Sequence, residues 1–114
     1  MKTKIININN IDILFYIGQN KYENFEIIDM ASDNDLWFHA SDTSSCHVIA
    51  SIPSDINKDL LNKIIIQGSL LCKINTNKLK NINNVNICYT QIKNITKTNV
   101  IGMVNTTNTK IISI

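Results

Sequence analysis

The apolar positions near the start of the chain predict a strand followed by a helix. Residues 11–17 are almost uniformly apolar, and the run stops at Gly18, a residue free to adopt the positive φ of a turn. Between residues 20 and 30, apolar side chains recur at roughly helical spacing among acidic and polar neighbours. These side chains are Tyr22, Phe25 and Ile28. We therefore expect a buried or half-buried strand, a turn and a short amphipathic helix.

The longest amphipathic pattern covers residues 55–76. Its apolar side chains follow the i, i+3, i+4, i+7 rule, with lysine and asparagine on the opposite face, and they predict the main helix. Gly68 lies on the apolar stripe. Because glycine lowers helix propensity, its presence there favours a close approach of the helix to a sheet. The stripe consists of Leu60, Leu61, Ile64, Ile65, Gly68, Leu71 and Cys72.

Five further segments have the composition of strands. Residues 35–40 and 46–51 are apolar and aromatic, and the polar, turn-forming run between them predicts a hairpin. After a link rich in asparagine and lysine, three short β-branched segments predict three more strands. The expected fold is therefore α+β, a mostly antiparallel sheet with one long and one short helix covering a face. The last three segments are residues 85–90, 100–105 and 110–114.

The expected register of the hairpin places two histidines beside a tryptophan. If Ala40 lies opposite Cys46, then His39 lies opposite His47, and Trp37 projects from the same face because side chains alternate along a strand. Such a face could hydrogen-bond a phosphate or a 2′-hydroxyl and stack a base. The three side chains could instead bond one another and hold the loop in place. Both interpretations stay open at this point.

The size and charge of the chain define what kind of binding is possible. With 114 residues, 44% of them hydrophobic and 18% charged, the chain is expected to form a single domain over residues 1–114. A net charge of +2 is too small to hold a polyanion through a diffuse field. Any contact with nucleic acid must therefore come from locally clustered lysines. Arginine is absent, so lysine supplies point charges in place of the arginine fork.

The cysteines favour a reduced, cytoplasmic protein. Cys46, Cys72 and Cys88 are widely spaced, without a CxxC pair, which argues against a disulfide framework and against a zinc site. Two histidines also lack a third ligand at zinc spacing, and we expect no metal and no other cofactor. The apolar stretches after Met1 fall far short of the roughly 18 residues of a membrane span. No targeting segment is visible.

The pattern of nucleophiles and bases does not favour catalysis. Cys46 and His47 are neighbours on an expected strand, so their side chains point to opposite faces and cannot share a proton. A hydrolase built on His39, His47 and an aspartate would lack a phosphate-binding glycine loop and an evident nucleophile. We therefore expect a binding domain and no enzyme.

Three motifs give the chain a resemblance to the NFACT-R domain family, and the resemblance covers residues 16–114. A string of six residues with one tryptophan, one phenylalanine and one histidine is the most specific of them. The order of segments is most similar to the stand-alone eukaryotic branch, whose members continue into a C-terminal coiled coil that residues 1–114 do not contain. The motifs are GQNKYEN at residues 18–24, DLWFHA at 35–40 with CHV at 46–48, and Tyr89-Thr90 with Lys93, Lys97 and GMV at 102–104.

The resemblance implies binding to RNA, and in some branches to DNA. The expected partners are transfer RNA or ribosomal RNA, together with the ribosome or its quality-control factors. An adaptor that docks a translation or quality-control factor stays open as the alternative. Gln19 stands where the family usually has a basic residue, which weakens the expected phosphate contact near Gly18. Combined with the hairpin register, the resemblance suggests nucleic-acid contacts at Trp37, His39, His47, Asn20, Lys21, Lys93 and Lys97.

Overall fold

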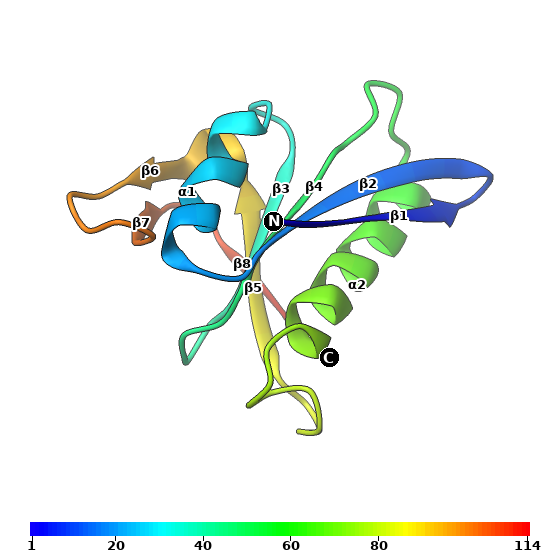
Figure 1. Ribbon diagram of the computed structural model, residues 1–114. Coiled ribbons are helices and arrows are strands. Elements are labelled where there is room, and N and C mark those ends of the chain that lie inside the picture. Colours follow the sequence, from blue (N-terminus) through cyan, green and yellow to red (C-terminus); the bar gives the residue numbers. More distant parts are fainter.

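The computed structural model describes residues 1–114 as eight strands, two α-helices and one short 3-10 helix (Figure 1). The elements are β1 (Lys2–Ile8), β2 (Ile11–Gly18), α1 (Lys21–Met30), β3 (Leu36–Ala40), β4 (His47–Ala50), α2 (Lys58–Ile74), β5 (Asn86–Gln91), η1 (Ile92–Asn94), β6 (Ile95–Lys97), β7 (Val104–Thr106) and β8 (Lys110–Ser113). Six strands form one antiparallel sheet in the order β1-β2-β4-β3-β5-β8, and β6 pairs with β7 as a separate ribbon. The expected α+β fold with one long and one short helix is confirmed.

The two helices cover opposite faces of the sheet. α2 packs against the main core, which includes Phe38, Val48 and Ile64. α1 packs on the other face, where Ile27 and Trp37 belong to a smaller core. Figure 1 shows the two helices on either side of the central strands. The expectation that both helices cover one face is wrong, because β3 and β4 carry buried apolar side chains on both sides and each side needs its own cover.

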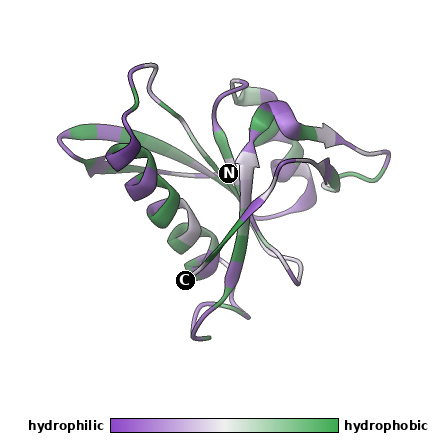
Figure 2. Cartoon of the chain, turned by 180° about the vertical axis from the view of Figure 1, so that it is seen from behind, coloured by the Kyte–Doolittle hydropathy of each residue, from purple (hydrophilic) through white to green (hydrophobic).

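Gly68 brings α2 into direct contact with the central sheet. A Cβ at this position would lie 2.4 Å from ring carbons of Phe38, which confirms the expected close approach. α2 begins at a regular cap, because the side-chain oxygen of Asn57 accepts a hydrogen bond of 2.8 Å from the amide of Leu60. Figure 2 shows apolar and polar residues interleaved along this helix. Neither α2 nor α1 is long and apolar enough to span a bilayer.

The hydrophobic pattern does not reveal β1, because most of its side chains are exposed and only Ile8 is buried. The strand is held by a two-residue turn at Asn9 and Asn10, whose φ values of 53° and 65° are both positive. Such a turn matches the twist of a hairpin, and asparagine tolerates its left-handed backbone. Ile8 consequently pairs with Ile11, and β1 forms an edge of the sheet.

Residues 100–103 form a turn and not part of a strand, so the prediction for residues 100–105 is wrong in its first part. Gly102 has a φ of 85°, and a Cβ there would lie 2.6 Å from Cβ of Lys21. The turn therefore packs against the start of α1. β7 follows the turn and pairs with β6 alone, outside the main sheet. β-branched composition suggested a strand where the backbone needs a glycine to reverse direction.

Candidate functional site

The hairpin of β3 and β4 has the register expected from the sequence. Trp37 pairs with Ile49 and Phe38 pairs with Val48, and this register continues toward His39 and His47. The two imidazole rings have centroids 4.9 Å apart, and the His39 ring stacks on the Trp37 indole at 5.6 Å. The predicted side-by-side arrangement of two imidazoles and an indole is confirmed.

The group of Trp37, His39 and His47 is mostly closed to solvent. Trp37 is 3% exposed, because α1 and η1 cover it with Ile27 and Ile92, and His47 is 4% exposed. His39 is half-buried at the edge of the group. The expectation that all three present an open binding face is therefore wrong for Trp37 and His47. The alternative holds for these two, since the indole N–H donates to Nδ1 of His47 at 3.1 Å.

Both imidazoles are neutral near pH 7. Burial, followed by the nearby charge of His39, lowers the pKa of His47 from 6.5 to about 3. Burial also lowers the pKa of His39, and the positive charge of Lys78 adds to this effect. Nδ1 of His47 accepts a hydrogen bond from the indole N–H, so the ring of neutral His47 carries its own proton on Nε2. Only half-buried His39 can offer a hydrogen bond to a ligand, and neither ring supplies positive charge.

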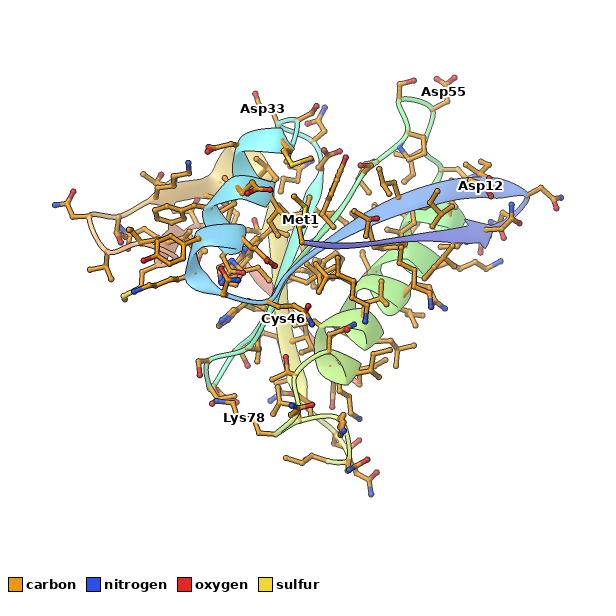
Figure 3. The ribbon with its side chains drawn as sticks, viewed as in Figure 1. Met1, Asp12, Asp33, Cys46, Asp55 and Lys78 are labelled. Atoms are coloured by element: carbon orange, nitrogen blue, oxygen red, sulfur yellow. The ribbon has the colours of Figure 1, made fainter.

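A polar pocket of about 480 Å³ lies where the start of α1 meets two loops. One loop is the turn of the β3–β4 hairpin, around residues 44–46, and the other follows α2, at residues 75–78. Lysine, asparagine and hydroxyl side chains dominate its lining, with Lys21 and Lys78 as the two charges and no carboxylate. Figure 3 labels Cys46 and Lys78, which lie toward the same end of the molecule. We call this feature the polar pocket.

The motif at residues 18–24 builds one wall of the polar pocket. Asn20 caps α1, and its side-chain oxygen accepts hydrogen bonds of 3.0 Å from the amides of Tyr22 and Glu23. Gly18 is needed because a Cβ there would lie 2.5 Å from Oδ1 of Asn24. The motif thus forms a local structure that places Asn20, Lys21 and Asn24 together. Its charge pattern alone would not predict the burial of Asn24.

Lys2 and Lys78 extend the positive surface around the polar pocket. The ammonium of Lys2 donates to Oδ1 of Asn75 at 2.8 Å, and that of Lys78 donates to Oγ of Ser44 at 2.8 Å. The set of contact residues predicted from the sequence includes neither Lys2 nor Lys78. Only the fold brings these two residues, which are 76 positions apart in the chain, close to the same pocket: Lys78 lines it, and Lys2 bonds the lining residue Asn75.

Lys93 and Lys97 lie apart from the polar pocket. The ammonium of Lys97 forms an ion pair with Asp29 and sits 5.0 Å from the centre of the Phe25 ring. Lys93 lines a different groove, of about 1050 Å³, which also contains Asp33. The predicted set of seven residues therefore divides into the buried hairpin group, the α1 start and these two separate lysines.

The cysteines are all free thiols. Cys46 and Cys72 are buried, and Cys88 is half-buried. Cys46 belongs to the main core beneath α2, whereas His47 lies on the α1 face, so the two side chains point apart as expected for strand neighbours. The chain has no cluster of three or more histidine, cysteine, aspartate or glutamate side chains that could hold a metal ion.

Comparison with known proteins identifies the family. The family model described as the NFACT protein RNA binding domain matches residues 4–109. The chain belongs to the NFACT-R family. The stand-alone eukaryotic branch that the motifs resembled is coiled-coil domain-containing protein 25. The NFACT-R domain is 36% identical to this protein from Danio rerio over 84 residues, and 31% identical to the one from Mus musculus over 93 residues.

These relatives are longer than the chain. The matches cover 73% and 81% of this chain but 41% and 45% of the two relatives, so the chain spans less than half of their length. The fold is also shared with the C-terminal of the fibronectin/fibrinogen-binding protein from Streptococcus suis. That structure matches with a TM-score of 0.81 at 21% identity, over the whole chain and 45% of the other. At this identity the likeness shows the fold alone.

Proposed function

We propose that this NFACT-R domain binds RNA through the surface around the polar pocket. The family is an RNA-binding domain family and not a catalytic one. The observation that carries the proposal is the carboxylate-free lining, with Lys21 and Lys78 on two of its walls and Lys2 bound to Asn75 nearby. Such a local concentration of positive charge is what a chain with a net charge of only +2 needs to hold phosphates.

Two other lysines of the chain are paired with carboxylates. Lys63 lies 3.2 Å from Asp59, and Lys97 pairs with Asp29. Neither Lys21 nor Lys78 forms an ion pair, and the lining of the polar pocket holds no carboxylate, so a phosphate backbone would meet little opposing charge there. If three lysines contact phosphates of a single strand, the logarithm of the affinity should fall with the logarithm of salt with a slope of about −2.

The hairpin group takes a supporting role in this proposal. Trp37 and His47 lie beneath the surface, and their hydrogen bond fixes the ring of His39, which stacks on the indole. His39 is half-buried, so one edge of its ring can hydrogen-bond a ribose or a phosphate. Of the seven residues predicted from the sequence, we expect His39, Asn20 and Lys21 to make direct contacts beside Lys78.

Fluorescence anisotropy with a labelled single-stranded RNA, over a series of salt concentrations, tests the proposal. Lys21→Gln and Lys78→Gln should each weaken binding and flatten the salt slope by about 0.7. Lys63→Gln removes an equal charge far from the polar pocket and serves as the matched control. Equal losses in all three variants, or an affinity that does not respond to salt, would contradict the proposal.

We propose transfer RNA or ribosomal RNA in the cytoplasm as the natural ligand. Binding of unmodified transfer RNA, ribosomal RNA fragments and a DNA strand of matched sequence would rank these candidates. If a DNA strand binds as tightly as RNA, the function is general nucleic-acid binding and not RNA-specific binding. Association with ribosomal large subunits can be followed by sedimentation in the same buffers.

One observation favours an adaptor as the second candidate. The turn between β6 and β7 exposes the apolar side chains Val100, Ile101 and Met103 beside Lys21, the kind of surface a protein partner buries. Sedimentation with ribosomal large subunits separates the candidates. Protein docking predicts that Met103→Lys releases the domain and Lys21→Gln does not, whereas RNA binding predicts the reverse.

A further inference from the structure

Asn24 holds a buried amide that the fold does not use. The residue is 8% exposed, and its side-chain oxygen Oδ1 is the one fully buried side-chain polar atom of the chain without a hydrogen-bond partner. Nearly all buried polar atoms in proteins are paired, because an unpaired one loses its bonds to water without replacement. An exception therefore needs an explanation in the function or in the packing.

The amide of Asn24 is held in place by its surroundings. Oδ1 lies against Gly18, where a Cβ would approach it to 2.5 Å. The backbone N–H of Asn24 donates a hydrogen bond of 2.9 Å to the carbonyl of Asn20. Asn24 nevertheless lines the polar pocket. Oδ1 is an acceptor and stays enclosed, so it cannot contact an anion. Nδ2 forms no hydrogen bond within the chain and is not among the buried unpaired atoms, so it is the group of Asn24 that a ligand in the pocket can reach. A fixed, unused donor at the wall of a pocket suits an acceptor from outside.

Three other groups around the polar pocket suit an anion, whereas the backbone amide of Gln19 already bonds the carboxylate of Glu23 at 3.1 Å. The start of α1 carries the positive end of the helix dipole, and Asn20 already caps two of its amides while its own Nδ2 stays free. The ammonium of Lys78 is tethered to Ser44, and Lys21 extends from the first residue of α1 over the Tyr22 ring at 5.3 Å. Two cations from separate elements thus flank the amides.

We propose that the polar pocket binds a single phosphate group of the RNA, with Lys21 and Lys78 supplying charge and Nδ2 of Asn24 donating a hydrogen bond. This inference rests on the proposed function and assigns one phosphate subsite within it. The volume of about 480 Å³ accommodates the phosphate with its attached ribose. Two groups of an RNA could supply this phosphate. They are the phosphomonoester at an end of the strand and a phosphodiester within it.

NMR of the ¹⁵N-labelled chain during titration with inorganic phosphate tests the subsite directly. The side-chain amide of Asn24 and the backbone amide of Lys21 should shift in a saturable way. Lys78→Gln should weaken phosphate binding about tenfold, as the loss of one charge-assisted hydrogen bond does. Lys80→Gln is the matched control, because Lys80 is an exposed lysine of the same segment that does not line the polar pocket. Shifts confined to residues outside the pocket would overturn the inference.

RNA binding by the same variants separates failure of the subsite from failure of the function. If RNA binds but Lys78→Gln and Lys80→Gln lose affinity equally, the phosphate subsite is wrong and RNA binding stands. If neither phosphate nor RNA binds, both proposals fall. Oligouridylates with a 5′-phosphate or a 5′-hydroxyl identify the source, since tighter binding of the phosphorylated strand indicates an RNA end and equal binding indicates an internal phosphodiester.

Discussion

Trp37 and His47 are joined by a buried hydrogen bond of 3.1 Å between the indole N–H and Nδ1 of the imidazole. The two residues come from adjacent strands, and α1 covers Trp37. A buried donor that loses its acceptor has already given up its hydrogen bonds to water, and nothing then offsets that cost in free energy. The bond therefore ties β3 to β4 beside His39, whose ring stacks on the indole.

His47→Ala should lower the free energy of unfolding by about 2 to 4 kcal/mol, because it leaves a cavity and an unpaired indole N–H. His39→Ala should lower it less, since His39 is half-buried and does not carry this bond. Urea unfolding followed by Trp37 fluorescence measures both variants. Equal destabilisation by the two substitutions would show that the indole bond contributes little.

Acid should destabilise the domain well before its carboxylates protonate. The pKa of His47 is about 3 in the folded chain and near 6.5 when unfolded, so between these values the unfolded chain binds more protons. The stability contributed by neutral His47 is complete above pH 6.5 and falls as the pH decreases below it. The slope is at most about 1.4 kcal/mol per pH unit for one such group.

Urea unfolding at pH 7, 6 and 5 measures this dependence on pH. His47→Gln keeps a polar side chain that cannot gain a proton, and its unfolding free energy should change less over the same interval. The lowered pKa of His39 acts in the same direction and leaves a smaller residual slope in that variant. A slope in His47→Gln as steep as in the wild type would assign the effect to other groups.

Gly68→Ala should destabilise the domain, although alanine ordinarily favours a helix over glycine by about 1 kcal/mol. The added Cβ would lie 2.4 Å from the ring of Phe38, which is fully buried and cannot move aside without disturbing the core. We expect a net loss of about 1 to 3 kcal/mol in urea unfolding. The double variant Gly68→Ala/Phe38→Leu makes room at this contact. If it is no more stable than the sum of the two single changes predicts, the contact is not the cause.

Local patterns were sufficient to predict α2, the β3–β4 hairpin and its register. The helical stripe around Gly68 and the alternation from Trp37 to His39 depend on neighbouring residues alone. The side of α1 that faces the sheet could not be predicted in this way. Its apolar Tyr22 is exposed while polar Asn24 is buried, because the packing of Gly18 against the helix decides the orientation and hydropathy does not.

The candidate site was predictable only in the part encoded by one motif. Asn20 and Lys21 lie at the polar pocket because the motif at residues 18–24 forms a cap and a first helical turn. Lys78 lies at the same pocket because it follows the C-terminal end of α2, whereas Lys97 forms an ion pair with Asp29 elsewhere. Both positions depend on tertiary packing. The exposure of Trp37 was mispredicted for the same reason, since α1 covers it.

Gly102→Ala should weaken RNA binding from a position outside the polar pocket. The residue has a φ of 85°, which strains any other L-residue, and its Cβ would lie 2.6 Å from Cβ of Lys21. We expect the turn to move away from α1, the unfolding free energy to fall by about 1 to 2 kcal/mol, and Lys21 to lose its fixed position.

Anisotropy with single-stranded RNA and urea unfolding measure the two effects of Gly102→Ala together. Met103→Ala is the matched control, because Met103 follows Gly102 in the same turn, is 58% exposed and should change neither quantity. A loss of affinity in Gly102→Ala that exceeds the loss in Met103→Ala, at temperatures where both variants are folded, ties the turn to the RNA surface through Lys21. Unchanged affinity in Gly102→Ala despite reduced stability would show that this contact supports the fold alone.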